Sequence, residues 1–583
     1  MMTITALRRE YLSGARTPAE VIGGIFARIR AEGLAPVWIS VDQHSALARA
    51  NSVDLSLPLA GVPFAVKDNI DVEGLPTTAG CPPYAYPAVR SATVVQRLLD
   101  AGAILIGKTN MDQFATGLVG TRSPFGACSN VFDADYVSGG SSSGSAVAVA
   151  SGLCAFSLGT DTAGSGRVPA AFNNLVGLKP TRGLLSTAGV VPACRSLDCV
   201  SIFATSADAA GLVWSVAQGY DSLDPYSRTF SPGAGAAPWL TSAFRFGVPD
   251  ESDLRFFDDA ETPGLYRQAI RRMESAGGTR VTVDFAPFRE AAELLYSGPW
   301  VAERFAAVGE FILQGLAGVD ETVGRIIESG ANYGAADAYR AAYRLEALKR
   351  DAAKQWAHID VLLLPTAGTI YKKDAVAADP LRLNANLGYY TNFVNLMDLA
   401  AIAVPAGFRR DGMPFGVSIV APAFTDRALV ALGKRFLHES GGADQGAPGC
   451  VSVAVVGAHL SGQPLNHQLT GRGARVVKSC RTAPDYRLFA LGDTIPPKPG
   501  LLREDGYNGP GVALEVWAVP EDHFGGFVAA VPPPLAIGSV RLETGEWVKG
   551  FVCEPIGLQG ATDITHFGGW RTYLDSLRET SVP

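Results

Sequence analysis

Two loops rich in serine and glycine, separated by a run of small apolar residues, constrain the fold of this chain more than any other feature. The first is SGGSSSGSA (138–146) and the second is GTDTAGSGR (159–167). Glycine lets the backbone turn sharply or approach another group closely, and serine hydroxyls hydrogen-bond to nearby backbone. Such clusters are more often flexible linkers. Here the intervening AVAVASGLCAFSLG is too apolar for a solvated linker, so we expect both loops to be held against a core.

The second loop contains a candidate nucleophile, Ser165. Its glycine neighbours, Gly164 and Gly166, leave successive backbone N–H groups uncovered, and such groups can converge on a developing oxyanion. A serine hydroxyl needs a base to remove its proton, and none of the three histidines before residue 450 adjoins a glycine-rich turn. Lys67, at the end of the apolar run in LAGVPFAVK, serves as the base if burial lowers its pKa. A lysine at a strand end more often keeps its ammonium group in water.

The composition describes a large, mildly acidic chain. Its 583 residues are 47% hydrophobic, which is enough for more than one domain. A net charge of −7 offers no basic face to nucleic acid or acidic membranes, and no apolar run reaches about 18 residues. The eight cysteines show no CxxC pair and no Cys/His ligand spacing, which is typical of reduced, mostly buried thiols. We therefore expect a cytoplasmic protein with no cofactor, metal, nucleic-acid partner or membrane partner.

Short apolar runs and helical patterns alternate from about residue 58 to 205, which predicts an α/β architecture around a buried sheet. A capping-box pattern from Thr17 to Glu20 marks the start of a helix, and helical patterns dominate 260–357. The polar, Pro- and Gly-rich segment 220–239 is expected to be a surface connection.

A glycine-rich break near residue 440 divides the chain. SGGADQGAPG (440–449) separates a helical pattern from strand-like runs. We expect a first domain at 1–440, a linker at 441–449, and a mostly β domain at 450–583.

The motifs of the first domain resemble those of the amidase signature family over about residues 20–435. GVPFAVKDNIDVEGLPTTAG (61–80) resembles the lysine segment of that family, and the two serine loops resemble its serine motifs. The resemblance implies a central mixed sheet flanked by helices and a Ser-Ser-Lys triad. By motif position, Lys67 is the base, Ser141 the bridging serine and Ser165 the nucleophile. The resemblance also implies a cis peptide between Gly140 and Ser141.

The residues alone do not distinguish Ser141 from Ser142 and Ser143, which are adjacent and equally nucleophilic; only the family motif does. In the implied mechanism, neutral Lys67 withdraws a proton through Ser141 from the attacking serine. We expect the oxyanion to be stabilised by the backbone N–H groups of Thr162, Ala163, Gly164 and Ser165.

Two segments resemble the allophanate hydrolase branch of the family, namely TDTAGSGRVPAAFNNLVGLKPTRG (160–183) and TGLVGTRSPFG (116–126), and SGPWVAER (297–304) corresponds to the carboxylate-binding segment of that branch. In that branch a tyrosine and an arginine hold the carboxylate of the substrate, and by position these are Tyr296 and Arg304. Gly117 is also assigned to substrate binding. From the residues alone, an arginine beside aromatic residues is equally well a surface arginine stacked on a ring.

The second domain carries a weaker resemblance. SVAVVGAHLSGQPLNHQL (452–469) is similar to the opening of gamma-glutamyl cyclotransferase-like folds, and allophanate hydrolases carry such a domain. The branch associates it with decarboxylation of N-carboxycarbamate. His459 and His467 are the acid/base candidates because imidazole titrates near neutral pH. The turn-like setting PLNHQL favours His467, although either histidine is equally well structural.

The branch implies an enzyme that releases ammonia from the terminal amide of allophanate, acts as a homodimer and is linked functionally to a urea carboxylase. Two alternatives stay open. In the first, the chain is a general aliphatic amidase or the amidase component of a tRNA-dependent amidotransferase. In the second, the C-terminal domain is only a dimerisation or docking module.

Overall fold

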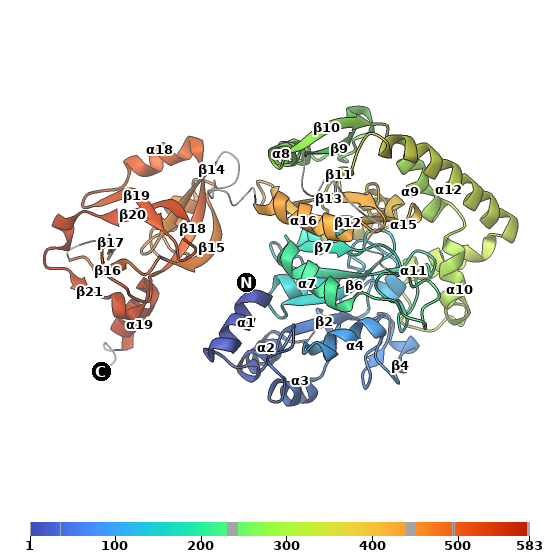
Figure 1. The fold of residues 1–583 in the computed structure, drawn as a ribbon, viewed down its shortest axis with the longest axis horizontal. Helices are drawn as coiled ribbons and strands as arrows, with labels where there is room; N and C mark the ends of the chain where they lie inside the picture. Colours follow the sequence, from blue (N-terminus) through green and yellow to red (C-terminus); the bar gives the residue numbers. More distant parts are fainter. Residues whose placement is uncertain are drawn as a thin grey trace. The chain divides into compact units, whose positions relative to one another are not determined.

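The computed structural model in Figure 1 describes residues 2–34, 36–229, 243–438, 450–492, 494 and 496–579. The chain forms two compact units, Met1–Leu437 and His438–Pro583. The expected linker at 441–449 lies outside the described residues, as does the second half of the expected connection at 220–239.

An eleven-stranded mixed sheet forms the centre of the N-terminal unit (Figure 1), in the order β1-β5-β2-β6-β8-β7-β12-β13-β11-β9-β10. Strand β2 is parallel to both β5 and β6, whereas β8 runs antiparallel to β6. The strands are β1 (Trp38–Val41), β2 (Pro63–Lys67), β5 (Ile104–Thr109), β6 (Phe156–Asp161), β7 (Val176–Lys179), β8 (Cys199–Ala204), β9 (Phe244–Pro249), β10 (Gly278–Val283), β11 (Val361–Pro365), β12 (Leu399–Phe408) and β13 (Pro414–Pro422). A separate two-stranded sheet pairs β3 (Pro76–Thr77) with β4 (Tyr86–Pro87).

Helices surround this sheet, which confirms the predicted α/β architecture. They are α1 (Ile4–Ser13), α2 (Pro18–Glu32), α3 (Gln43–Ala50), α4 (Thr93–Asp100), α5 (Ser143–Ala150), α6 (Val168–Phe172), α7 (Ala207–Ala217), α8 (Thr262–Ser275), α9 (Ala286–Ser297), α10 (Val301–Ile312), α11 (Glu321–Glu328), α12 (Ala335–Trp356), α13 (Lys373–Ala378), α14 (Arg382–Leu387), α15 (Phe393–Leu396) and α16 (Asp426–His438). The predicted capping box is present at α2, where Thr17 and Glu20 each accept a hydrogen bond from the other's backbone N–H.

The run of small apolar residues between the two serine loops becomes α5 and β6. Helix α5 contacts β2 and β6, and seven of its eight residues are buried. Because β2 and β6 are neighbouring parallel strands, their carboxyl ends meet at one edge of the sheet. Both serine loops are therefore held against a core, as expected, and the end of β2 lies beside the loop that follows β6.

The C-terminal unit is mostly β, as predicted. A five-stranded sheet has the order β15-β18-β14-β20-β19, and a three-stranded sheet has the order β17-β16-β21. The strands are β14 (Cys450–Val455), β15 (Arg475–Arg481), β16 (Tyr486–Ala490), β17 (Pro499–Arg503), β18 (Ala513–Pro520), β19 (Leu535–Arg541), β20 (Trp547–Cys553) and β21 (Thr562–Asp563), and the helices are α17 (His467–Thr470), α18 (Glu521–Ala529) and α19 (Trp570–Glu579).

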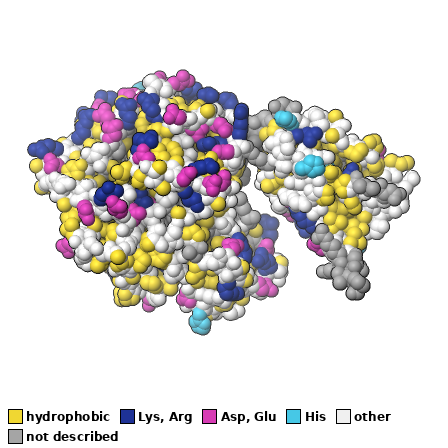
Figure 2. Space-filling model, turned by 180° about the vertical axis from the view of Figure 1, so that it is seen from behind, with side chains coloured by type: hydrophobic (Ala, Val, Ile, Leu, Met, Phe, Trp, Pro, Cys, Tyr) yellow, Lys and Arg dark blue, Asp and Glu magenta, His cyan; other side chains and the backbone are white. Residues whose placement is uncertain are grey.

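All eight cysteines are free thiols. Within the described ranges, no helix combines the length and the apolar character needed to cross a bilayer, and no three His, Cys, Asp or Glu side chains gather as a metal site. Figure 2 shows Lys and Arg side chains interspersed with Asp and Glu on the drawn face of the N-terminal unit, so this face carries no patch of a single sign.

Candidate active site

Lys67, Ser141 and Ser165 form a continuous hydrogen-bonded chain. The Nζ atom of Lys67 lies 2.8 Å from Ser141 Oγ, which in turn lies 3.0 Å from Ser165 Oγ. The exposed fractions are 0% for Lys67 and Ser141 and 3% for Ser165. Hydroxyl hydrogens rotate to suit their partners, so this chain can carry a proton from Ser165 towards the amine. The structure thus brings together the three residues to which the family motif assigns the triad.

The structure also separates the three adjacent serines of the first loop. The hydroxyls of Ser142 and Ser143 lie 3.1 and 3.5 Å from backbone carbonyl oxygens and donate to them. Ser141 alone of the three contacts both the lysine and the second loop. The peptide bond between Gly140 and Ser141 is cis, as the family resemblance implied.

Burial gives the Lys67 amine the properties of a base. Desolvation lowers the pKa of Lys67 to about 7, although the nearby carboxylates of Asp112, Asp198 and Asp161 act in the opposite direction. A lysine with this pKa is substantially neutral near neutral pH and can accept a proton. Thr160 Oγ1, 2.8 Å from Nζ, accepts a second hydrogen bond and fixes the direction of the amine.

A buried ion pair shapes the loop that carries the nucleophile. The Asp161 carboxylate accepts hydrogen bonds from Arg167 Nε and Nη2, both at 2.9 Å, and neither side chain is exposed. The same carboxylate accepts from the backbone N–H groups of Gly164 (2.9 Å) and Gly166 (3.1 Å). The loop is therefore wrapped around one carboxylate, with Ser165 between its two anchored glycines.

This arrangement excludes Gly164 from the four expected oxyanion donors. The N–H of Gly164 is committed to Asp161 and is not available to an oxyanion. The N–H groups of Thr162, Ala163 and Ser165 have no hydrogen-bond acceptor in the part of the chain that the structure describes. These three remain the candidate donors, because an oxyanion hole requires N–H groups that are free before the substrate arrives.

Arg304 is a buried arginine, not a surface one. It extends from α10 and is 2% exposed, with Nη1 at 2.9 Å from Thr116 Oγ1 and Nη2 at 3.5 Å from the hydroxyl of Tyr296 on α9. Its guanidinium lies near enough to the relay to lower the pKa of Lys67. Among the described residues, no carboxylate forms an ion pair with Arg304. Burial acts to lower the pKa of Arg304, but neighbouring side chains, among them the carboxylates of Asp198 and Glu303, raise it overall. The guanidinium is therefore charged, and with no carboxylate at ion-pair distance it is suited to bind an anionic group.

Gly117 adjoins the Arg304 contact. It follows Thr116 directly and has a φ of +155°, and a Cβ at this position would lie 2.7 Å from Asp112 Oδ2. Asp112 is itself fixed by the backbone N–H groups of Gly120 and Arg122. The structure therefore explains glycine at this position by close packing beside the site, whereas contact with a substrate stays a prediction.

Three functional contacts were missed from the sequence. They are the Thr160 hydroxyl on the base, the Asp161–Arg167 pair, and Asp198, which accepts a hydrogen bond from the Thr162 hydroxyl. Burial raises the pKa of Asp198 to about 6. The spacing of an acid four residues before Ser165 and an arginine two residues after it was the available signal for the ion pair.

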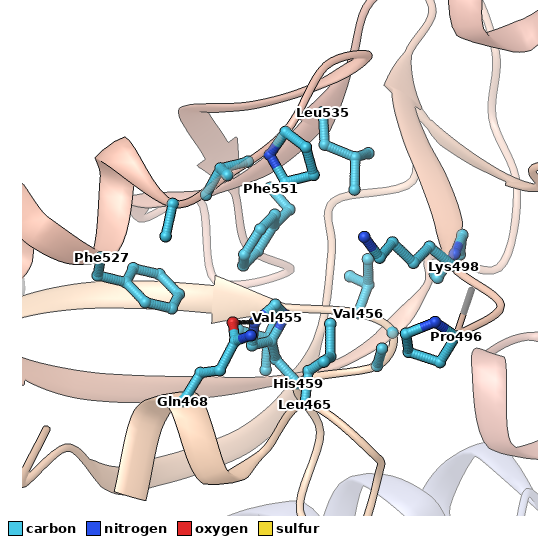
Figure 3. A pocket seen from close by; sticks show the side chains of 16 residues that line it. Val455, Val456, His459, Leu465, Gln468, Pro496, Lys498, Phe527, Leu535 and Phe551 are labelled. Carbon is cyan, nitrogen blue, oxygen red and sulfur yellow. Dashed lines mark hydrogen bonds between the residues drawn. The ribbon is translucent and has the colours of Figure 1, made fainter. Parts of the chain in front are cut away.

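A second candidate site lies in the C-terminal unit (Figure 3). A cavity of about 230 Å³ is lined mostly by apolar side chains, with His459, Gln468 and Lys498 as its polar members. The Nε2 atom of His459 lies 3.0 Å from Gln468 Oε1, and the imidazole stacks on the Phe551 ring with centroids 4.8 Å apart. Burial lowers the pKa of His459, so the imidazole is neutral at neutral pH.

His467 does not line this cavity. It begins the one-turn helix α17, is exposed, and its Nδ1 lies 2.9 Å from the carbonyl oxygen of Pro464. The same turn directs the neighbouring Gln468 into the cavity. The structure therefore favours His459 over His467 as the acid/base candidate of this cavity, and a catalytic role for either histidine stays a prediction.

A model of the amidase family matches residues 25–430, which include both serine loops and Lys67. The chain belongs to the amidase family. A second family model, the allophanate hydrolase C-terminal domain, matches residues 451–575 of this amidase.

Comparison with individual proteins places this amidase in the branch that contains the allophanate hydrolases. It is 44% identical over 604 residues to a urea amidolyase from Lachancea kluyveri, a match that covers 97% of this chain and 33% of that protein. The chain thus spans about a third of the length of that relative. A solved structure of selenomethionine-substituted allophanate hydrolase from Kluyveromyces lactis is 43% identical, with a TM-score of 0.71, and the match covers 98% of this chain and 99% of that one.

The N-terminal unit also resembles another group of amidases. The chain is 33% identical over 486 residues to a glutamyl-tRNA(Gln) amidotransferase component from Prochlorococcus marinus (strain MIT 9211), a match that covers 75% of this chain and 96% of that protein. The Lachancea and Kluyveromyces matches extend over nearly the whole chain, whereas this one leaves a quarter of it uncovered.

Proposed function

We propose that this amidase hydrolyses allophanate and releases ammonia from its terminal amide. The observation that carries this proposal is that the Lys67–Ser141–Ser165 chain shares a buried region with Arg304, a guanidinium without a carboxylate partner among the described residues. Allophanate is a urea that carries a carboxylate. It therefore needs a cation at one end of its site and an activated serine at the other.

In the proposed reaction, Ser165 Oγ attacks the carbon of the terminal amide while its proton passes through Ser141 to neutral Lys67. The N–H groups of Thr162, Ala163 and Ser165 stabilise the oxyanion that forms. The relay returns the proton to the amide nitrogen, the C–N bond breaks, and ammonia leaves. Water then hydrolyses the acyl-enzyme and releases N-carboxycarbamate.

We infer that the C-terminal unit assists decarboxylation of this N-carboxycarbamate in the cavity of Figure 3. His459 supplies an imidazole that exchanges a proton with the nitrogen of the intermediate, and Lys498 supplies a positive charge for a carboxylate. Replacing His459 with alanine is expected to slow release of carbon dioxide and leave the first ammonia unchanged. The matched variant His467→Ala leaves both rates unchanged, and equal effects of the two variants on carbon dioxide release argue against the assignment.

We also propose a homodimer and a functional link to a urea carboxylase. The link is supported by the relatives named urea amidolyase, which are about three times as long as this chain. Light scattering of the full chain after gel filtration measures the oligomeric state, and a monomeric mass refutes the dimer. The domain boundaries stay a proposal, for which a 1–440 truncation that folds and releases ammonia is the test.

The test of the main proposal compares ammonia release from allophanate, malonamate, acetamide and glutamine. For Arg304→Ala we expect kcat/KM on allophanate to fall by about 10- to 150-fold, the equivalent of a charged hydrogen bond of about 1.5–3 kcal/mol. Activity on neutral acetamide is expected to change much less, because acetamide has no carboxylate for Arg304 to bind. Equal activity on acetamide and allophanate, unaffected by this variant, supports a general amidase instead. A requirement for a second protein, with glutamine as the preferred substrate, supports an amidotransferase component.

A further inference from the structure

A short loop, residues 193–198, connects the second serine loop (159–167, the nucleophile loop) with helix α10, which carries Arg304. We call residues 193–198 the bridging loop. Asp198 closes this loop on itself, because its carboxylate accepts hydrogen bonds from the backbone N–H groups of Ala193 (2.8 Å) and Cys194 (3.2 Å). The same carboxylate accepts a hydrogen bond from the hydroxyl of Thr162, one of the candidate oxyanion donors. One end of the bridging loop is therefore fixed to the nucleophile loop.

The other end of the bridging loop is fixed to the first turn of α10. Glu303, which directly precedes Arg304, accepts hydrogen bonds from the backbone N–H of Ser196 (2.9 Å) and from its hydroxyl. The thiol of Cys194 donates to the carbonyl oxygen of Trp300 at 3.5 Å, at the start of the same helix. Both carboxylate oxygens of Glu303 are thus used to hold the bridging loop.

Apolar packing fills the space between these two attachments. Ala163 of the nucleophile loop and Cys194 and Leu197 of the bridging loop belong to one buried cluster, against which Tyr296 and Trp300 pack. Closely packed interiors transmit displacement rather than absorb it. A shift of α10 relative to the bridging loop therefore changes the position of Arg304 relative to Ser165.

We propose that Glu303 is a positioning residue that sets the separation between the Arg304 guanidinium and the Ser165 hydroxyl. This inference rests on the proposed function, in which a substrate of fixed length spans those two groups. Glu303 is adjacent to Arg304 in the first turn of α10, so its two charge-assisted hydrogen bonds fix the position and rotation of that turn. A displacement of about 1 Å is enough to reduce a reaction by as much as about 100-fold when the reacting groups must be aligned.

A positioning role predicts a selective loss that a merely structural role does not. A substrate that carries a carboxylate depends on the separation between Arg304 and Ser165. A neutral reagent depends only on the relay and the oxyanion donors. Phenylmethylsulfonyl fluoride is such a reagent, since the Ser165 hydroxyl displaces its fluoride without any contact from a carboxylate.

The experiment measures two quantities on the full chain, namely kcat/KM for allophanate and the rate constant for inactivation by phenylmethylsulfonyl fluoride. For Glu303→Ala we expect kcat/KM to fall by about tenfold or more, with inactivation within about twofold of the unmodified chain. Glu303→Gln restores most of kcat/KM, because its amide oxygen accepts from the Ser196 N–H and its amide nitrogen donates to the Ser196 hydroxyl. The matched control is Glu310→Ala, an exposed glutamate on the same helix, which changes neither quantity.

Three results overturn the inference: an unchanged kcat/KM in Glu303→Ala, an equal fall in both quantities, or a failure of Glu303→Gln to restore turnover. If Glu303→Ala does not fold, Ser196→Ala provides the second test. It removes one of the two hydrogen bonds and is expected to lower kcat/KM for allophanate by a smaller factor without slowing inactivation. Failure of the proposed function is recognised separately, because the unmodified chain then shows no preference for allophanate over acetamide.

Discussion

The pH dependence of ammonia release is the sharpest consequence of burying Lys67. The relay requires the neutral amine, and the folded pKa is about 7 instead of the ordinary 10.5. With that pKa, about nine-tenths of the enzyme carries a neutral Lys67 at pH 8 and about one-tenth at pH 6. Because the pKa is lowered, activity is present above pH 7 and is lost as the pH falls through that value. We therefore expect kcat/KM for allophanate to fall by about tenfold between pH 8 and pH 6.

The assay follows ammonia from pH 5.5 to 9.5 at constant ionic strength. Ser165→Ala serves as the blank at every pH, which removes any spontaneous decomposition of the substrate. His459→Ala is the control for the half-buried imidazole of the second site, and it leaves the midpoint unchanged because the first ammonia is released in the N-terminal unit. A rate that continues to rise up to pH 9.5 without a plateau contradicts the argument, since it indicates a lysine with an ordinary pKa.

Two further predictions concern the framework of the site. Arg167→Met leaves the Asp161 carboxylate buried without its counter-charge, so we expect the N-terminal unit to lose about 3–5 kcal/mol of unfolding free energy in urea denaturation. The control Arg340→Met removes one partner of an exposed ion pair and has little effect on the unfolding free energy. Equal effects of the two variants contradict the reasoning. Gly117→Ala combines a φ of +155° with a Cβ 2.7 Å from a carboxylate oxygen, so it lowers the thermal midpoint by the equivalent of about 1–3 kcal/mol. Gly23→Ala, in open space on α2, does not lower the midpoint, and an unchanged midpoint in Gly117→Ala refutes the packing argument.

The sequence was sufficient for the fold class and for the candidate relay because both depend on local patterns. The alternation of apolar and helical segments predicted the central sheet, and the apolar run between the serine loops predicted that they are held against a core. The choice among Ser141, Ser142 and Ser143 was different. The three side chains are chemically identical, so the residues alone left the choice open and only the family motif assigned it to Ser141. The geometry shows that Ser141 is the one that reaches Lys67.

Other features depend on contacts that a sequence pattern does not contain. The Gly164 N–H is not available to an oxyanion, because the loop folds back and this N–H donates to Asp161. Neither residue type reveals that hydrogen bond in the sequence. His459 and His467 lie eight positions apart in one segment, and the single turn of α17 decides which of them enters the cavity. The attachment of Glu303 to Ser196 joins residues more than 100 positions apart. In each case the tertiary fold determines the chemistry of an otherwise ordinary side chain.

Ammonia release from allophanate by Ser165→Ala tests the central claim most directly. The account predicts a loss of at least about 10⁴-fold in kcat relative to the unmodified chain, because among the residues that the structure describes no other hydroxyl is joined to Lys67 through Ser141. Ser143→Ala is the matched control and retains turnover, since its hydroxyl contacts the Asn110 carbonyl oxygen and the Cys128 side chain and takes no part in the relay. A Ser165→Ala variant that keeps more than about a hundredth of the activity contradicts the assignment of the nucleophile.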